Sequence, residues 1–208
     1  MLEAKILAKV YSVMKRAGRE IALIIGLLLL VQRADAELPR VGSILPTVTV
    51  QRGGEIILGV DGDRRQPWHA SLLQSRPHLI IHVAGRLTAK QQLAPVLAQL
   101  SRAQWVNQQV VMTTIVDTDD SIWGSEPFVE HSILNSKKQS PSSHFVLDKS
   151  GVAAHQWHLQ PESAAVIVTT GQGRVIFFQQ APFSAASINQ LLSCLQQAIK
   201  SDLNSSFP

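Results

Sequence analysis

Residues 79–88 read Leu79-Ile80-Ile81-His82-Val83-Ala84-Gly85-Arg86-Leu87-Thr88, and this stretch decides the fold. Its first part is apolar except for His82, as expected for a strand that is covered on both faces of a sheet. Thr88 is expected to cap a following helix, because its side-chain oxygen can accept a hydrogen bond from a free helical amide. Apolar residues then recur at helical spacing, at Leu93, Val96, Leu97 and Leu100. The stretch therefore predicts a buried strand that turns directly into a helix.

The rest of the chain alternates strands and helices in the manner of α/β structure. Ser125 followed by Pro127 predicts the start of a second helix, and Ser184 is expected to cap the last one. Gly171-Gln172-Gly173 separates the last two apolar runs and predicts a hairpin. The further strand-like runs are 110–116, 145–147, 164–169 and 175–178, with a returning segment at 152–157.

An additional hairpin is expected before this unit. The runs 47–50 and 55–58 flank Gln51-Arg52-Gly53-Gly54, which predicts two strands with their turn at 51–54. Residues 62–77 are expected to form a loop, with Trp68 folded back onto the domain.

The order strand, helix, strand, helix, hairpin and helix is that of the thioredoxin fold. We therefore predict an α/β, thioredoxin-like three-layer sandwich with a central mixed sheet, helices on both faces and an extra N-terminal β-hairpin. Residues 37–208 are enough for one such domain and too few for two ordinary ones.

The sequence also resembles the YtfJ family of small exported bacterial proteins over residues 37–201. The motifs that carry this resemblance follow one order along the chain: Ala84-Gly85-Arg86, Thr114-Ile115-Val116, Thr118-Asp119-Asp120, Gly124-Ser125, Asp148 with Gly151, and Trp157-x-Leu159. The resemblance implies a thioredoxin-like, periplasmic protein, and it implies no reaction because the function of the family is poorly known. Asp117 departs from the family pattern, in which a neutral Asn is expected before Thr118.

The N-terminus has the pattern of an export signal. Three basic residues within 15–19 precede an apolar run at 21–31, and Ala34-Asp35-Ala36 supplies a cleavage site of the A-x-A type. The run is shorter than the roughly 20 residues that span a bilayer. We therefore expect a cleaved signal peptide over residues 1–36, with Met14 as an alternative start, and a periplasmic mature protein. An uncleaved membrane anchor is the alternative.

Most of the net positive charge lies in this leader. The whole chain carries +4, but residues 1–36 hold six of the 19 Lys and Arg and three of the 15 Asp and Glu, which leaves +1 for residues 37–208. A nearly neutral domain gives no electrostatic reason to expect nucleic acid or an anionic membrane as a partner.

Cysteine usage excludes redox chemistry. Cys194 is the only cysteine, and it is expected to pack as a small hydrophobe inside the last helix. Thiol-disulfide exchange needs a thiolate, but residues 85–88, where thioredoxins carry their cysteine pair, contain no sulfur. The loop in which thioredoxins place a cis-proline reads Glu162-Ser163-Ala164. We therefore exclude a thiol-disulfide oxidoreductase or a cysteine peroxidase, and we expect no cofactor.

Polar residues gather instead at the carboxyl ends of the central strands, where ligands bind in open α/β sheets. Three loops are expected to meet there and to line a crevice with Arg86, Thr88, Lys90, Asp117, Asp119, Asp120, Glu162 and Ser163. Ion pairs between the basic and acidic loops would merely close the edge of the domain. Arg86 with the helix start at Thr88 could bind an anion. We predict no metal site, and a hard cation held by Asp117, Asp119 and Asp120 is the weaker alternative.

Other motifs add little. His82 is expected to be a hydrogen-bonded core residue, and the chain contains neither H-E-x-x-H nor G-x-S-x-G. The predicted function is a non-redox periplasmic binding module whose partner is a protein or a small anionic ligand, without nucleic acid and without stable membrane insertion. The alternative is a metal- or carboxylate-dependent hydrolase that uses Asp119 and Asp120.

Overall fold

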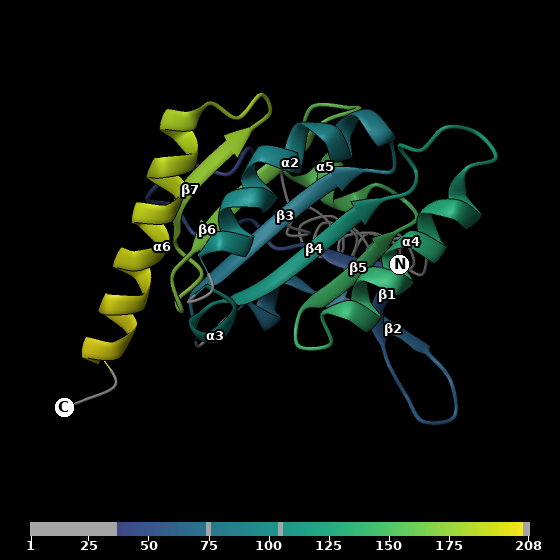
Figure 1. Ribbon diagram of the computed structural model, residues 1–208, viewed down its shortest axis with the longest axis horizontal. Helices are drawn as coiled ribbons and strands as arrows, with labels where there is room; N and C mark the ends of the chain where they lie inside the picture. The colour runs from purple at the N-terminus through teal and green to yellow at the C-terminus, as the bar shows by residue number, and fades with distance from the viewer. Residues whose placement is uncertain (1–36, 74–75, 104–105, 206–208) are drawn as a thin grey trace, which may run out of the picture. The chain divides into compact units, whose positions relative to one another are not determined.

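Seven strands form one mixed sheet in the computed structural model, which describes residues 37–73, 76–103 and 106–205 (Figure 1). The predicted signal peptide lies outside the described residues. Along the sheet the strands follow the order β2-β1-β5-β4-β3-β6-β7. Their bounds are β1 Thr49–Ile57, β2 Arg64–His69, β3 His78–Ala84, β4 Val111–Asp117, β5 His144–Asp148, β6 Ala164–Thr169 and β7 Val175–Gln180. The helices are η1 Ala70–Leu72, α2 Leu87–Arg102, α3 Val106–Gln109, α4 Glu126–Gln139, α5 Val152–Gln156 and α6 Ala185–Ser205.

Strand β3 lies inside the sheet, as its apolar sequence predicts. It pairs in parallel with β4 and antiparallel with β6, and all of its residues are buried. Strand β5 runs parallel to β4, so the carboxyl ends of β3, β4 and β5 lie at the same edge of the sheet. This edge carries the loops that the sequence analysis singled out.

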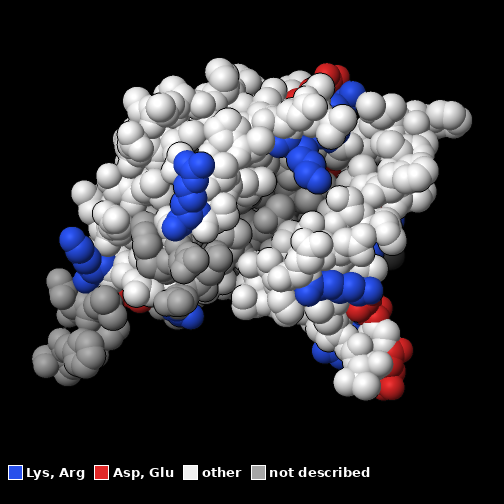
Figure 2. Space-filling model, in the orientation of Figure 1, with Lys and Arg blue, Asp and Glu red and all other residues white. Residues whose placement is uncertain are grey.

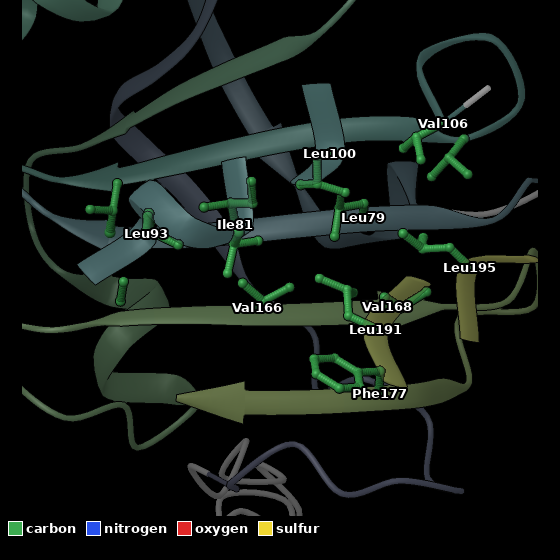
Figure 3. Packing of buried hydrophobic residues seen from close by; sticks show 14 of the residues in the cluster. Leu79, Ile81, Leu93, Leu100, Val106, Val166, Val168, Phe177, Leu191 and Leu195 are labelled. Atoms are coloured by element: carbon green, nitrogen blue, oxygen red, sulfur yellow. The ribbon is translucent and has the colours of Figure 1, made fainter. Parts of the chain in front are cut away.

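The two faces of the sheet are covered by separate apolar cores. Leu79 and Ile81 of β3 pack with α2 and α6 on one face, as Figure 3 shows through Leu93, Leu100, Leu191 and Leu195. Ile80 lies on the opposite face, in a core that includes Trp68 and Trp157. Helices cover both faces, which confirms the predicted thioredoxin-like sandwich.

The extra N-terminal hairpin exists, but its predicted turn is wrong. Strand β1 continues through Gly53 and Gly54, pairs with both β2 and β5, and shows an irregular register between Val50 and Glu55. A Cβ atom on Gly54 would lie 2.1 Å from the Gln66 carbonyl oxygen, so the chain needs glycine at this bulge. The turn follows β1 instead, and the predicted loop at 62–77 contains β2. Trp68 is buried in the domain as expected.

One helix boundary and one segment also differ from the predictions. Thr88 lies inside α2, and Arg86, with extended φ and ψ of −124° and 145°, occupies the N-cap without a side-chain cap. The segment at 152–157 forms α5 rather than a simple return. Ser184 does cap α6, because its Oγ accepts a hydrogen bond from the Ser187 amide at 3.1 Å.

Within the described residues no helix is both long enough and apolar enough to cross a bilayer.

Candidate functional site

The predicted loops meet at a three-way ionic junction. Arg86 Nε donates a hydrogen bond to Asp120 Oδ1 at 2.8 Å, and Arg86 Nη2 lies 3.3 Å from Glu162 Oε1. Asp120 Oδ2 accepts a hydrogen bond from the Glu162 amide. One arginine and one aspartate therefore connect the loops that follow β3 and β4 with the loop that precedes β6.

The junction neutralises its own charges. The hydrogen bond to Asp120 is the main cause that raises the pKa of Arg86, and the charges of Asp120 and Glu162 act in the same direction. The side chains of Arg86 and Asp120 are 26% and 19% exposed, whereas Glu162 is 62% exposed. Since two carboxylates already neutralise the guanidinium, Arg86 is poorly placed to attract an additional anion.

Asp117 lies beneath the junction and is only 3% exposed. Its Oδ1 accepts a hydrogen bond from the Asp120 amide at 3.1 Å. Burial raises the pKa of Asp117 to about 6, the carboxylates of Asp148, Asp120 and Asp119 add to this rise, and the Asp120 hydrogen bond opposes it.

Asp148 occupies the neighbouring position on β5 and is fully buried. Its two carboxylate oxygens accept hydrogen bonds from the Ser150 amide at 3.2 Å and the Ala153 amide at 2.8 Å. These bonds fix the start of α5 against the sheet. From the sequence, Asp148 was expected only as a turn residue, and its place beside Asp117 was not predicted.

Asp119 joins the cluster through Gly151. A Cβ atom on Gly151 would lie 3.3 Å from Asp117 Oδ2 and 3.5 Å from Asp119 Oδ2, so the glycine backbone lies close to both carboxylates. In the described part of the chain, no group of three or more His, Cys, Asp or Glu side chains is suitable to hold a metal ion. The cation alternative therefore gains no support from this geometry.

The remaining predicted site residues lie around the junction. Ser163 is buried, its Oγ lies 3.4 Å from Gln92 Oε1, and its carbonyl accepts a hydrogen bond from Ala84. Thr88 and Lys90 are exposed in the first turn of α2. In the residues described, no side-chain hydrogen bond or ion pair connects Thr88 or Lys90 to the junction. We use the name strand-end cluster for Arg86, Asp117, Asp119, Asp120 and Glu162.

His82 differs from its prediction as a hydrogen-bonded core residue. It is 3% exposed, but its Nε2 has no hydrogen-bond partner and lies 4.0 Å from Asp117 Oδ2. Burial lowers the pKa of His82 to about 4, and the Asp120 charge opposes this shift. The apolar pattern of β3 indicates burial but cannot show which group faces the imidazole.

An apolar rim that was not predicted from the sequence flanks the strand-end cluster. The rim consists of four exposed side chains, which are Leu87 at 68%, Ile122 at 59%, Trp123 at 99% and Phe128 at 79%. Leu87 begins α2 directly after Arg86, Ile122 and Trp123 lie in the loop after β4, and Phe128 lies in α4. A Cβ atom on Gly85 would lie 2.9 Å from Ser121 Cβ, so the loop after β3 contacts the loop after β4. The one sign of this rim in the sequence is the pair Ile122-Trp123, two apolar residues that fit neither a strand nor a helix pattern and so are not expected in the core.

On the face shown in Figure 2, the Lys and Arg side chains are scattered and form no contiguous basic patch. Cys194, the lone thiol, is partly buried in α6, and burial raises its pKa. A thiol with a raised pKa is a poor nucleophile at neutral pH.

The fold and the cluster define a thioredoxin-like domain that carries a carboxylate–arginine junction at the strand ends and no cysteine pair. Solved structures with this fold include a crystal structure of a provisionally assigned thiol:disulfide interchange protein DsbE from Chlorobium tepidum, with a TM-score of 0.52 and 13% identity, covering 77% of this chain and 99% of that one. Another is the reduced 2-Cys peroxiredoxin of Plasmodium vivax, with a TM-score of 0.51 and 10% identity, covering 77% and 98%. At these identities the likeness shows the fold alone.

The chain belongs to the family described as "Bacterial protein of unknown function (YtfJ_HI0045)", whose model matches residues 40–198. It is 33% identical over 173 residues to "Uncharacterized protein YtfJ" of Escherichia coli K12, covering 83% of this chain and 94% of that protein. It is 29% identical over 156 residues to an "Uncharacterized protein" of Haemophilus influenzae, covering 75% and 85%. The resemblance to the YtfJ family is thus confirmed.

Proposed function

We propose that this chain is an exported, non-redox binding module that contacts a protein partner through the apolar rim and the strand-end cluster. The observation that carries the proposal is the exposure of Trp123 at 99% among other large apolar side chains. An almost fully exposed tryptophan is a candidate for contact with a partner, because tryptophan is enriched among the residues that dominate binding energy.

A protein partner fits these residues better than a small anion does. Arg86 is the basic residue of the cluster, and Asp120 and Glu162 already neutralise it. A small anion would have to displace at least one carboxylate. A protein can instead bury Trp123 and Phe128 and leave the ionic junction intact at its polar border.

The hydrolase alternative finds less support. Both carboxylate oxygens of Asp120 accept hydrogen bonds, from Arg86 and from the Glu162 amide. A general base needs a free oxygen within reach of a substrate or a water. Asp119 is exposed, but the neighbouring carboxylate of Asp117 is buried and accepts a hydrogen bond from the Asp120 amide.

Export to the periplasm is part of the same proposal. It rests on the basic stretch, the apolar run and Ala34-Asp35-Ala36 at the N-terminus. A single unpaired cysteine is compatible with this compartment because the domain depends on no disulfide.

Site-directed photo-crosslinking tests the proposed surface. A photoreactive amino acid placed at position 123 is expected to cross-link one protein in living cells of the native bacterium. The matched control is position 197, an exposed glutamine on α6. Trp123→Ala and Phe128→Ala should weaken binding of the purified partner at least tenfold, with unchanged melting temperature. Equal cross-linking at 123 and 197, or phosphate binding that Arg86→Ala removes, would contradict the protein-binding proposal.

A further inference from the structure

Three ionisable side chains lie on one face of the sheet, near the carboxyl ends of β3, β4 and β5. His82 on β3, Asp117 on β4 and Asp148 on β5 occupy positions of the same parity as Ile80, Ile115 and Val146, which belong to the core beneath α5. Asp117 is the direct neighbour of Asp148 in the pairing of β4 and β5. All three are at least nine-tenths buried, with exposures of 3%, 3% and 0%.

His82 and Asp117 face each other without a bond. His82 Nε2 lies 4.0 Å from Asp117 Oδ2, which is longer than a hydrogen bond, and Nε2 has no other hydrogen-bond partner. An unpaired buried polar atom costs free energy and calls for an explanation. A proton held between these two atoms would supply one.

The charges around Asp117 favour that proton. The negative charges of Asp148, Asp120 and Asp119 all act on Asp117, and Arg86, the cation of the strand-end cluster, is bound to Asp120 and Glu162. Helix α5, which covers this face, presents its amide at Ala153 to Asp148 and carries an exposed His155. Ionised Asp117 therefore lies in a buried, acidic environment, where a carboxylate is unstable.

We propose that His82 and Asp117 form a buried proton-binding site. One proton adds to Asp117 Oδ2, and a small side-chain movement that shortens the 4.0 Å separation lets the resulting carboxylic acid donate a hydrogen bond to His82 Nε2. The imidazole stays neutral, with its own hydrogen on Nδ1 in this state. No other bond forms or breaks. Asp117 Oδ1 keeps the hydrogen bond that it accepts from the Asp120 amide.

The site is coupled to the surface through that same bond. Asp117 Oδ1 holds the Asp120 amide, and the Asp120 carboxylate holds Arg86 and Glu162. Binding of the proton removes a negative charge directly below the strand-end cluster. The inference concerns the interior of the domain and stands whether or not the apolar rim binds a protein.

Nuclear magnetic resonance of the folded mature protein tests this site. We expect the Asp117 carboxyl carbon to titrate with a midpoint near pH 6, while the His82 ring nitrogens report a neutral imidazole from pH 7.5 to 5. The Nε2 shift should change with the same midpoint as Asp117, because Nε2 becomes the acceptor of the new hydrogen bond. A His82 ring that becomes cationic near pH 6.5, or an Asp117 midpoint near 4, would overturn the proposal.

Two variants separate a shared proton from burial alone. His82→Leu keeps the site dry but removes the acceptor, so the Asp117 midpoint should fall by about one pH unit. Asp119→Asn is the matched control, because it changes an acidic neighbour that does not face His82, and the Nε2 response should persist. An unchanged Asp117 midpoint in His82→Leu would show that burial alone holds the proton. If His82→Leu does not fold, the titration of the unmodified protein still decides between the outcomes.

Discussion

Asp120 shows how much one side chain can organise at the end of a sheet. Its carboxylate binds the Arg86 side chain and the Glu162 backbone, and its own amide binds Asp117. A partly exposed ion pair alone contributes little to stability. The main effect of Asp120 is to hold three loops in fixed positions, and these loops lie next to the apolar rim.

The raised pKa of Asp117 predicts how the free energy of unfolding of Asp117→Asn depends on pH. The pKa of Asp117 is raised to about 6, so its ionisation penalises the folded state above pH 6, and this penalty disappears as the pH falls toward 4. The asparagine variant lacks the penalty. Its free energy of unfolding relative to the unmodified protein should therefore fall by about 2 kcal/mol between pH 7.5 and 4.5.

Urea unfolding at a series of pH values measures this difference. The lowered pKa of His82 has the opposite effect, since the folded state resists protonation of the imidazole as the pH falls below 6.5. Between pH 4 and 6, the free energy of unfolding of the unmodified protein should therefore change less with pH than that of Asp117→Asn or of His82→Leu. Asp119→Asn is the control and should show a much smaller pH-dependent difference, because the Asp119 charge is the weakest of the causes that raise the pKa of Asp117. A flat difference for Asp117→Asn would contradict the assigned shift.

At the scale of elements, β1 is where sequence reasoning failed for a physical reason. Gln51-Arg52-Gly53-Gly54 has the composition of a hairpin turn, and a bulge uses the same residues. The choice depends on β5, which is far away in the sequence and pairs with Gly53 and Gly54. Buried β3, by contrast, was predictable because its apolar run needs no distant partner to be recognised.

Gly54→Ala tests the bulge. Its φ of +73° is unfavourable for alanine, and the added Cβ would lie 2.1 Å from the Gln66 carbonyl oxygen, so the neighbouring strand must move. Gly173→Ala is a matched control with a φ of +75° and nothing within 4 Å of the new Cβ. Gly54→Ala should lower the free energy of unfolding by at least about 2 kcal/mol more than Gly173→Ala. Equal losses would show that β1 and β2 are not tightly paired there.

At the scale of the whole molecule, the sequence predicted the architecture and part of the site. Arg86 and Asp120 meet because the parallel strands β3 and β4 end at one edge, and Glu162 joins them because β6 runs antiparallel to β3 and begins at that edge. The proximity of His82 to Asp117 was not predictable, since both belong to strands whose apolar pattern indicates burial and not which side chains are neighbours. The apolar rim was not predicted, because the sequence pattern around Trp123 and Phe128 does not indicate that these apolar side chains are exposed.

The last prediction concerns maturation of the whole chain. If Ala34-Asp35-Ala36 is a cleavage site, the protein recovered from the periplasm of a Gram-negative host should begin at Glu37 by intact mass. Ala36→Tyr should block cleavage, because signal peptidase sites require a small residue there, and should leave a longer, membrane-associated form. Gln197→Ala on α6 is a control that should mature normally. A full-length, membrane-bound form of the unmodified chain would instead support the anchor alternative, since residues 21–31 would then hold the protein at the membrane.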